Sequence, residues 1–244
     1  MFSDFHLPLS PVDRVNKPPL FFLQIQDGLI LLSGVCWTIA YILYIRQAHR
    51  DKSYGMPIVT LCANITWEFM FGGFMATSAA QVVAFLPWAI IDVFIVHATW
   101  KYGRKQWEYA PMVAENLGWI LLGGIALMFV MFWTLVQTLG SVAQACFYIA
   151  WADQLVLTTT SVAQLMCRGN TGGHSWTIWF TRSIGTVVAV LVYVWRHSYY
   201  PDNYPFAATP FTIFLIGVSE VADITYPFVY AAVARKEKEK EKLK

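Results

Sequence analysis

The residues most able to do chemistry in this 244-residue sequence are carboxylic acids that stand inside long apolar stretches. Glu68, Asp92, Asp153 and Asp223 each lie near the middle of such a stretch, and Glu220 lies one helical turn from Asp223. Ionising a carboxyl group away from water is costly, so some of these acids should carry a proton. A buried protonated carboxyl group can act as a general acid, and a neighbouring carboxylate can stabilise positive charge. The pattern therefore predicts proton transfer in an apolar interior.

Each acid taken alone also has a simpler interpretation as a hydrogen-bonded element of helix packing. For Glu68 the functional interpretation is favoured, because Asn64 precedes it by four residues and shares its helical face. Arg182 is the one basic residue clearly inside an apolar stretch. A single arginine cannot neutralise five or six carboxylates, so the interior is expected to be acidic.

Aromatic residues accompany these acids. Trp67 adjoins Glu68, Tyr226 follows Asp223 by three residues, and Trp179 lies in the preceding apolar stretch. Aromatic faces stabilise cations, although any single aromatic residue is more often part of the packing. Taken with the acids, they predict an apolar pocket suited to a cationic intermediate.

The composition is that of an integral membrane protein. The chain is 57% hydrophobic and 13% charged, against about 45–50% and 25% in soluble domains. This composition argues against a soluble enzyme, a disordered chain and a coiled coil. The four cysteines and five histidines lack the spacing of metal ligands, so no metal and no cofactor are predicted. No basic face interleaved with aromatic residues indicates nucleic-acid binding.

An all-α, polytopic membrane helix bundle with seven transmembrane helices is predicted, because seven stretches approach the ~20 apolar residues that a span requires. They cover residues 27–46, 56–76, 80–100, 113–136, 141–166, 176–195 and 210–233. We expect an extended lumenal N-terminal tail over residues 1–26, the seven-helix transmembrane domain over 27–234, and a cytosolic Lys/Glu tail over 235–244.

The distribution of basic residues predicts the orientation. Thirteen lysines and arginines fall on the side of the C-terminus and three on the side of the N-terminus, which places the C-terminus in the cytosol and the N-terminus in the lumen. Lys240 and Lys242 also match a dilysine-type retrieval signal of the endoplasmic reticulum. An alternating Lys/Glu tail would produce the same match by chance.

Four segments carry a family resemblance when they are taken in order. Residues 64–68 read N-x-x-W-E, and residues 107–119 contain W-x-x-A-P with a following Asn and Trp. Residues 168–182 read R-G-x-T-x-G-x-S-x-T-x-W-x-x-R, and Asp223 follows Glu68 by 155 residues. These segments resemble the fungal integral-membrane terpene cyclases of the paxilline and pyripyropene type, which make meroterpenoids and indole diterpenes.

The resemblance implies a catalytic pair, Glu68 and Asp223. It also implies a reaction in which the enzyme protonates the terminal epoxide (or olefin) of a polyprenyl chain attached to an aromatic polyketide or indole. A cationic cascade then closes the rings without a metal or cofactor, as an isomerase- or lyase-type step of secondary metabolism. The residues expected to bind or orient the substrate are Asn64, Trp67, Asn116, Asp153, Trp179, Arg182 and Tyr226.

Some positions depart from the family pattern. Asp92, Glu115 and Asp153 stand where comparable members carry neutral residues, and Glu220 and Pro227 also differ. These departures bear on the substrate and the ring pattern more than on the reaction class. The oligomeric state is left open.

Two other functions remain as alternatives. A proton-coupled small-solute transporter also uses midplane carboxylates, but the repeated halves common in transporters are not evident. A seven-helix receptor or membrane scaffold is the second alternative.

Overall fold

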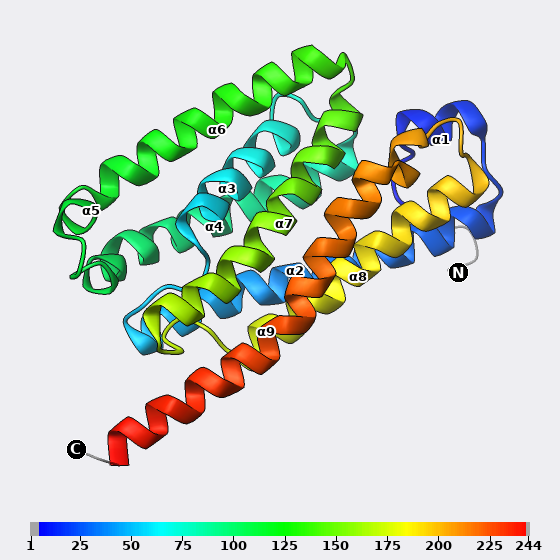
Figure 1. Cartoon of the computed structure of the whole chain (residues 1–244). Helices are drawn as coiled ribbons and strands as arrows, with labels where there is room; N and C mark the ends of the chain where they lie inside the picture. Colours follow the sequence, from blue (N-terminus) through cyan, green and yellow to red (C-terminus); the bar gives the residue numbers. More distant parts are fainter. Residues whose placement is uncertain (1–4, 243–244) are drawn as a thin grey trace.

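Helices make up most of the molecule. Within residues 5–242, which the computed structural model describes, the chain forms helices and loops but no strand. The all-α prediction is therefore confirmed. In chain order (Figure 1) the helices are α1 (Pro11–Asn16), α2 (Leu20–Asp51), α3 (Ile58–Gly72), α4 (Ala79–Gln106), α5 (Pro111–Glu115), α6 (Leu117–Leu139), α7 (Val142–Arg168), α8 (Trp176–Tyr199), the 3₁₀ helix η1 (Pro205–Ala208) and α9 (Pro210–Lys242).

Five of these helices are long and apolar enough to cross a membrane: α2, α4, α6, α8 and α9. In the most apolar 18-residue stretch of each helix, only 17% to 33% of the stretch is buried inside the protein. Most of this apolar surface therefore faces outward, as contact with lipid requires. The other two expected spans differ. The apolar helix α3 has 15 residues, a length of about 22 Å against a hydrocarbon core of about 30 Å, and α7 falls short in apolar content.

Serine caps and glycine termini set the ends of several helices. The hydroxyls of Ser78, Ser141 and Ser175 accept hydrogen bonds from backbone N–H groups in the first turns of α4, α7 and α8. Such caps satisfy donors that the helix leaves free, and each contributes about 1 kcal/mol. At the other end, Gly140 and Gly169 adopt left-handed conformations that end α6 and α7. These local signals separate α6, α7 and α8 into distinct helices with short connections.

The helices form two groups that share α2. In one group α3 contacts α4, α6 and α7, and in the other α8 and α9 contact each other (Figure 1). Because α2 packs against both α4 and α8, its side chains can reach both groups. The helix α7, which contacts both α3 and α9, joins the groups on another side.

Two loops close one end of this arrangement. The α2–α3 loop lies directly against the α7–α8 loop, where the N–H of Gly173 donates to Asp51 Oδ2 at 2.9 Å. The guanidinium of Arg168 donates to the carbonyl oxygen of Tyr54 at 2.6 Å and lies 4.1 Å from its ring centroid. A Cβ at Gly55 would come within 2.1 Å of the Gly173 carbonyl oxygen. We call residues 52–57 and 169–175 together the loop clasp.

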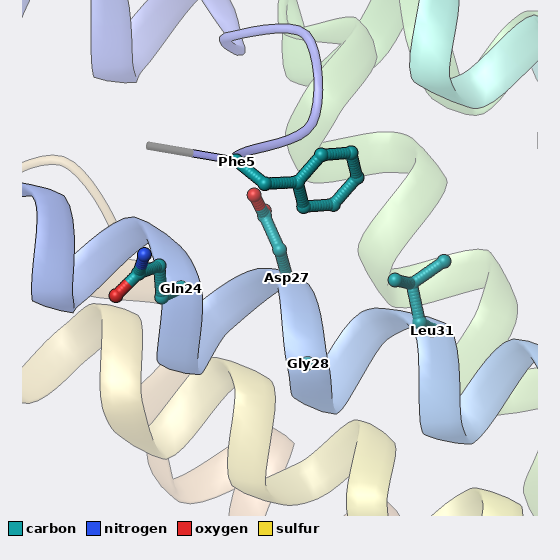
Figure 2. Close-up of a pocket in the computed structure, with 5 residues that line it drawn as sticks. All are labelled: Phe5, Gln24, Asp27, Gly28 and Leu31. Carbon is teal, nitrogen blue, oxygen red and sulfur yellow. The ribbon is translucent and has the colours of Figure 1, made fainter. Parts of the chain in front are cut away.

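The N-terminal segment is not the extended tail that the sequence suggested. The structure has α1 there, and α2 begins at Leu20. The N–H of Leu7 donates to Asp27 Oδ2 at 2.6 Å, which holds the segment against α2. A hollow of about 200 Å³ lies between them. Figure 2 shows the residues that line it: Phe5, Gln24, Asp27, Gly28 and Leu31.

The Lys/Glu segment at the other end of the chain is also helical. Instead of a separate tail from residue 235, the structure shows α9 continuing through Lys242. Lys240 and Lys242 of the proposed retrieval signal are part of this helix, whereas Lys244 lies outside the described residues.

Candidate active site

Glu68 is fully buried on α3, and only one of its two carboxyl oxygens is hydrogen-bonded. Its Oε1 accepts from the hydroxyl of Tyr41 on α2 at 2.7 Å and from Asn64 Nδ2 at 3.2 Å. Its Oε2 is buried and has no hydrogen-bond partner among residues 5–242. A buried polar atom without a partner calls for an explanation, and a proton carried on this oxygen would supply one.

A second carboxyl group joins Glu68 through the Asn64 amide. Asn64 Nδ2 lies 2.7 Å from Oδ2 of Asp92 on α4 and 2.6 Å from the Tyr41 hydroxyl. Asp92 is fully buried, and its Oδ1 also lacks a partner in the described part of the chain. Two unscreened negative charges on one amide would repel each other strongly. The geometry therefore favours a pair of carboxyl groups in which at least one holds a proton.

Asp223 on α9 has different surroundings, because donors surround its carboxyl group. Oδ1 forms an ion pair with Nη2 of Arg182, and Oδ2 accepts from the Ser183 hydroxyl at 2.6 Å. The indole of Trp179 donates to the Asp223 backbone carbonyl at 2.9 Å. Asp223 and Arg182 are both buried. Two oxygens that both accept are the pattern of an ionised carboxylate, so Asp223 is suited to stabilising positive charge.

Tyr226 extends the Asp223 group toward the loop clasp. The Arg182 guanidinium lies 6.0 Å from the Tyr226 ring centroid, and the Tyr226 hydroxyl lies 3.0 Å from Nδ1 of His174. Burial lowers the pKa of the His174 imidazole from 6.5 to about 3, and the positive charges of Arg168 and Arg182 act in the same direction. His174 is therefore neutral at physiological pH.

Two tyrosines of α2 bring the acid groups to a common face. The Tyr41 hydroxyl donates to Glu68, and Tyr44 lies near Arg182 and Asp223. Both tyrosines are buried. Residues three apart on a helix lie about 4.5 Å apart along its axis and on the same side. The two acid groups therefore face the same short segment of α2.

The remaining predicted site residues lie at different distances from this centre. Trp67 donates its indole N–H to the Cys146 carbonyl at 2.9 Å, which ties α3 to α7. Asp153 is half-buried on α7 and lies near Glu68 and Asp92.

Asn116 lies apart from both acid groups. It stands exposed at the start of α6, where its amide donates to the Met112 carbonyl at 2.9 Å. Its contact with a substrate therefore stays a prediction. Glu115 is likewise exposed at the end of α5, whereas Glu220 is half-buried on α9 beside Asp223 and Arg182.

Sequence reasoning did not assign a role to Tyr41, Ser183 or His174. Ser183 directly follows the last arginine of the 168–182 segment, and His174 lies inside that segment. For His174 and Ser183, their position in or next to this segment is the signal that could have drawn attention to them. Their partners lie on other helices, which spacing along the chain does not reveal.

The fold and the site define a helical membrane protein with buried acid groups in its interior. Residues 12–236 match the family model of the Pyr4-like transmembrane terpene cyclases. The chain belongs to this family, and the resemblance noted in the sequence is confirmed.

Curated relatives agree with this assignment. The chain is 65% identical over 242 residues to the Pyr4-family terpene cyclase mfmH of Annulohypoxylon moriforme, with 99% of this chain and 100% of the relative covered. It is 37% identical to the terpene cyclase macJ of Penicillium terrestre (95% and 91% covered) and 29% identical to the terpene cyclase pyr4 of Aspergillus fumigatus (95% and 97% covered). No solved structure matches the chain. The protein is thus an integral membrane protein of a fungal terpene cyclase family.

Proposed function

We propose that this protein cyclises a polyprenyl chain attached to an aromatic polyketide or indole, beginning with protonation of the terminal epoxide (or olefin). The observation that carries the proposal is the free, buried Oε2 of Glu68 beside an Oε1 that already accepts two hydrogen bonds. Fixed in this way, a protonated Glu68 would present its O–H to the substrate oxygen.

The proposed reaction is an isomerisation, so the product contains the same atoms as the substrate. The proton moves from Glu68 to the epoxide oxygen, the adjacent C–O bond breaks, and the electron-poor carbon is attacked by the next double bond of the chain. The epoxide oxygen becomes a hydroxyl group, and each new C–C bond moves the positive charge onward. Loss of a proton from the last cation restores neutrality, and Asp153 and Asp92 are the candidate bases.

Asp223 would act on the charge that develops during this cascade. A carboxylate held by Arg182 and Ser183 does not need to reorganise when a cation forms nearby, and such preorganised charge is effective in a dry site. The faces of Trp179 and Tyr226 would add to this stabilisation. Asn64 and Tyr41 would hold Glu68 in its donor orientation.

We also propose the membrane arrangement inferred from the sequence. The protein would cross the endoplasmic reticulum membrane with seven helices, with a lumenal N-terminus and a cytosolic C-terminus. The five long apolar helices support this arrangement. The short α3 would span only where the bilayer adapts or thins around it.

Expression in a yeast or mould host tests the catalytic proposal. The host is fed epoxyfarnesyl-aromatic and epoxygeranylgeranyl-indole substrates, and the products are analysed. We expect cyclised product from the wild-type protein and its loss in Glu68→Gln and Asp223→Asn, with protein levels unchanged. Full activity in both variants would contradict the assignment. Proton-linked solute uptake into vesicles without any cyclised product would indicate a transporter instead.

A further inference from the structure

A hollow on the outer face of α8 lies directly beside Asp223. It has a volume of about 290 Å³ and is lined by Trp179, Phe180, Ser183, Ile184, Val187 and Val188. Phe180 and Val187 are 56% and 46% exposed, so this face of α8 points away from the bundle. We call these six residues the α8 hollow.

Two residues of the α8 hollow donate hydrogen bonds to Asp223. The Ser183 hydroxyl reaches Oδ2 at 2.6 Å, and the Trp179 indole reaches the backbone carbonyl at 2.9 Å. Lipid-facing positions of membrane helices are normally apolar, because hydrocarbon offers no partner to a polar group. Here the serine turns its hydroxyl away from the hollow to the buried carboxylate behind it, so that the wall itself stays apolar.

The loop clasp adds a second observation. The loops meet at the end of the bundle where α3 and α8 begin. There the N–H of Gly173 donates a hydrogen bond to Asp51 Oδ2 at 2.9 Å, and the Arg168 guanidinium donates to the Tyr54 carbonyl oxygen at 2.6 Å. Gly55 lies so close to Gly173 that no side chain fits between them. A lipophilic substrate dissolved in the bilayer would meet the side of the bundle and not this closed end.

We propose that the α8 hollow is the place where the isoprenoid chain of the substrate enters from the bilayer and lies against Ser183 and Asp223. This inference rests on the proposed cyclase function. A volume of about 290 Å³ is just below the range of small-molecule pockets, about 300–1,000 Å³. The hollow therefore accommodates only one part of a polyprenyl substrate.

The chemistry of the hollow favours an isoprenoid over a lipid acyl chain. Both chains would suit the apolar wall. Only a polyene chain gains positive charge during the reaction, and a carboxylate one serine away can stabilise that charge. An acyl chain would leave the Ser183–Asp223 pair without a role.

Filling the hollow tests the proposal without touching the acid. In Val187→Trp and Ile184→Trp, an indole would occupy the hollow while Ser183 and Trp179, the hollow residues that donate to Asp223, stay in place. We expect kcat/KM for the epoxide substrate to fall at least tenfold, mainly through KM. Val194→Trp is the matched control, because Val194 is also exposed on α8, two turns further along, and is outside the hollow. It should behave as the wild type. Wild-type kcat/KM in both hollow variants would overturn the proposal.

A second measurement separates this proposal from the cyclase function. A farnesyl chain that carries a diazirine is photolysed with the full-length protein in nanodiscs, and the labelled peptides are mapped. We expect labelling of residues 179–188 that Val187→Trp abolishes and that excess epoxide substrate blocks. Labelling that excess phospholipid suppresses equally well would identify a lipid site and overturn the proposal. If the wild-type protein cyclises nothing but this labelling persists, the cyclase function fails while the binding site stands.

Discussion

Replacing Arg182 by methionine would leave the Asp223 carboxylate buried without its counter-charge. The two side chains are only 1% and 4% exposed, so water cannot take the place of the guanidinium. Removing one partner of a buried ion pair costs about 3–5 kcal/mol. Arg182→Met should therefore lower the free energy of unfolding by this amount, which corresponds to a fall in Tm of about 6–20 °C for a chain of this size.

Two further variants give this prediction its controls. Arg235 and Glu239 form an ion pair at 3.6 Å with side chains 83% and 63% exposed, and an exposed pair contributes only about 0–1 kcal/mol. Arg235→Gln should therefore leave Tm nearly unchanged. Combining Arg182→Met with Asp223→Asn removes both buried charges and should recover most of the lost stability.

Thermal unfolding of the purified full-length protein, followed by tryptophan fluorescence in nanodiscs, measures all of these variants. The reasoning fails if Arg182→Met melts within two degrees of the wild type. It also fails if the double variant is no more stable than Arg182→Met alone. Either result would mean that the Asp223 charge is solvated or neutral, so that it does not depend on Arg182.

Three other changes have defined outcomes. The folded protein keeps His174 neutral down to about pH 3, while the unfolded chain takes up a proton below about pH 6.5. The free energy of unfolding should therefore fall by about 1.4 kcal/mol for each unit that the pH is lowered between these values. The free energy of unfolding of His174→Gln should depend less steeply on pH. Gly55→Ala places a Cβ 2.1 Å from the Gly173 carbonyl oxygen, which should lower the free energy of unfolding by about 1–3 kcal/mol and Tm with it. The control Gly123→Ala has open space around its Cβ and should not lower Tm. Tyr41→Phe removes a 2.7 Å hydrogen bond to Glu68 worth about 1 kcal/mol and should slow cyclisation by roughly fivefold. An unchanged rate at equal protein level would exclude Tyr41 from orienting the acid.

Interactions within one helix could be predicted from the sequence. Asn64 and Glu68 are four residues apart, and the structure shows the expected hydrogen bond between them at 3.2 Å. Helical periodicity alone determines such a pair. The link from Asn64 to Asp92 and the bond from Ser183 to Asp223 join different helices. They depend on the packing and rotation of whole helices, about which spacing along one chain says little.

The N-terminal segment shows how a correct local signal can be misread. Its four prolines suggested an extended tail, but Pro11 lies in the first turn of α1 and Pro19 directly precedes α2. Proline is well tolerated at the start of a helix, where its missing N–H has no helical partner to lose. Two of these prolines therefore mark where helices begin.

In the proposed cyclisation, the loop clasp has a consequence for the fate of the carbocation. A carbocation in contact with water is captured as an alcohol, so the lifetime of the proposed cation would depend on keeping that end of the bundle dry. The approach of Gly55 to Gly173, which leaves no room for a side chain, would then influence product identity as well as stability. Loosening the clasp should divert part of the cascade to prematurely hydroxylated, incompletely cyclised products, and their proportion would report how tightly the two loops close.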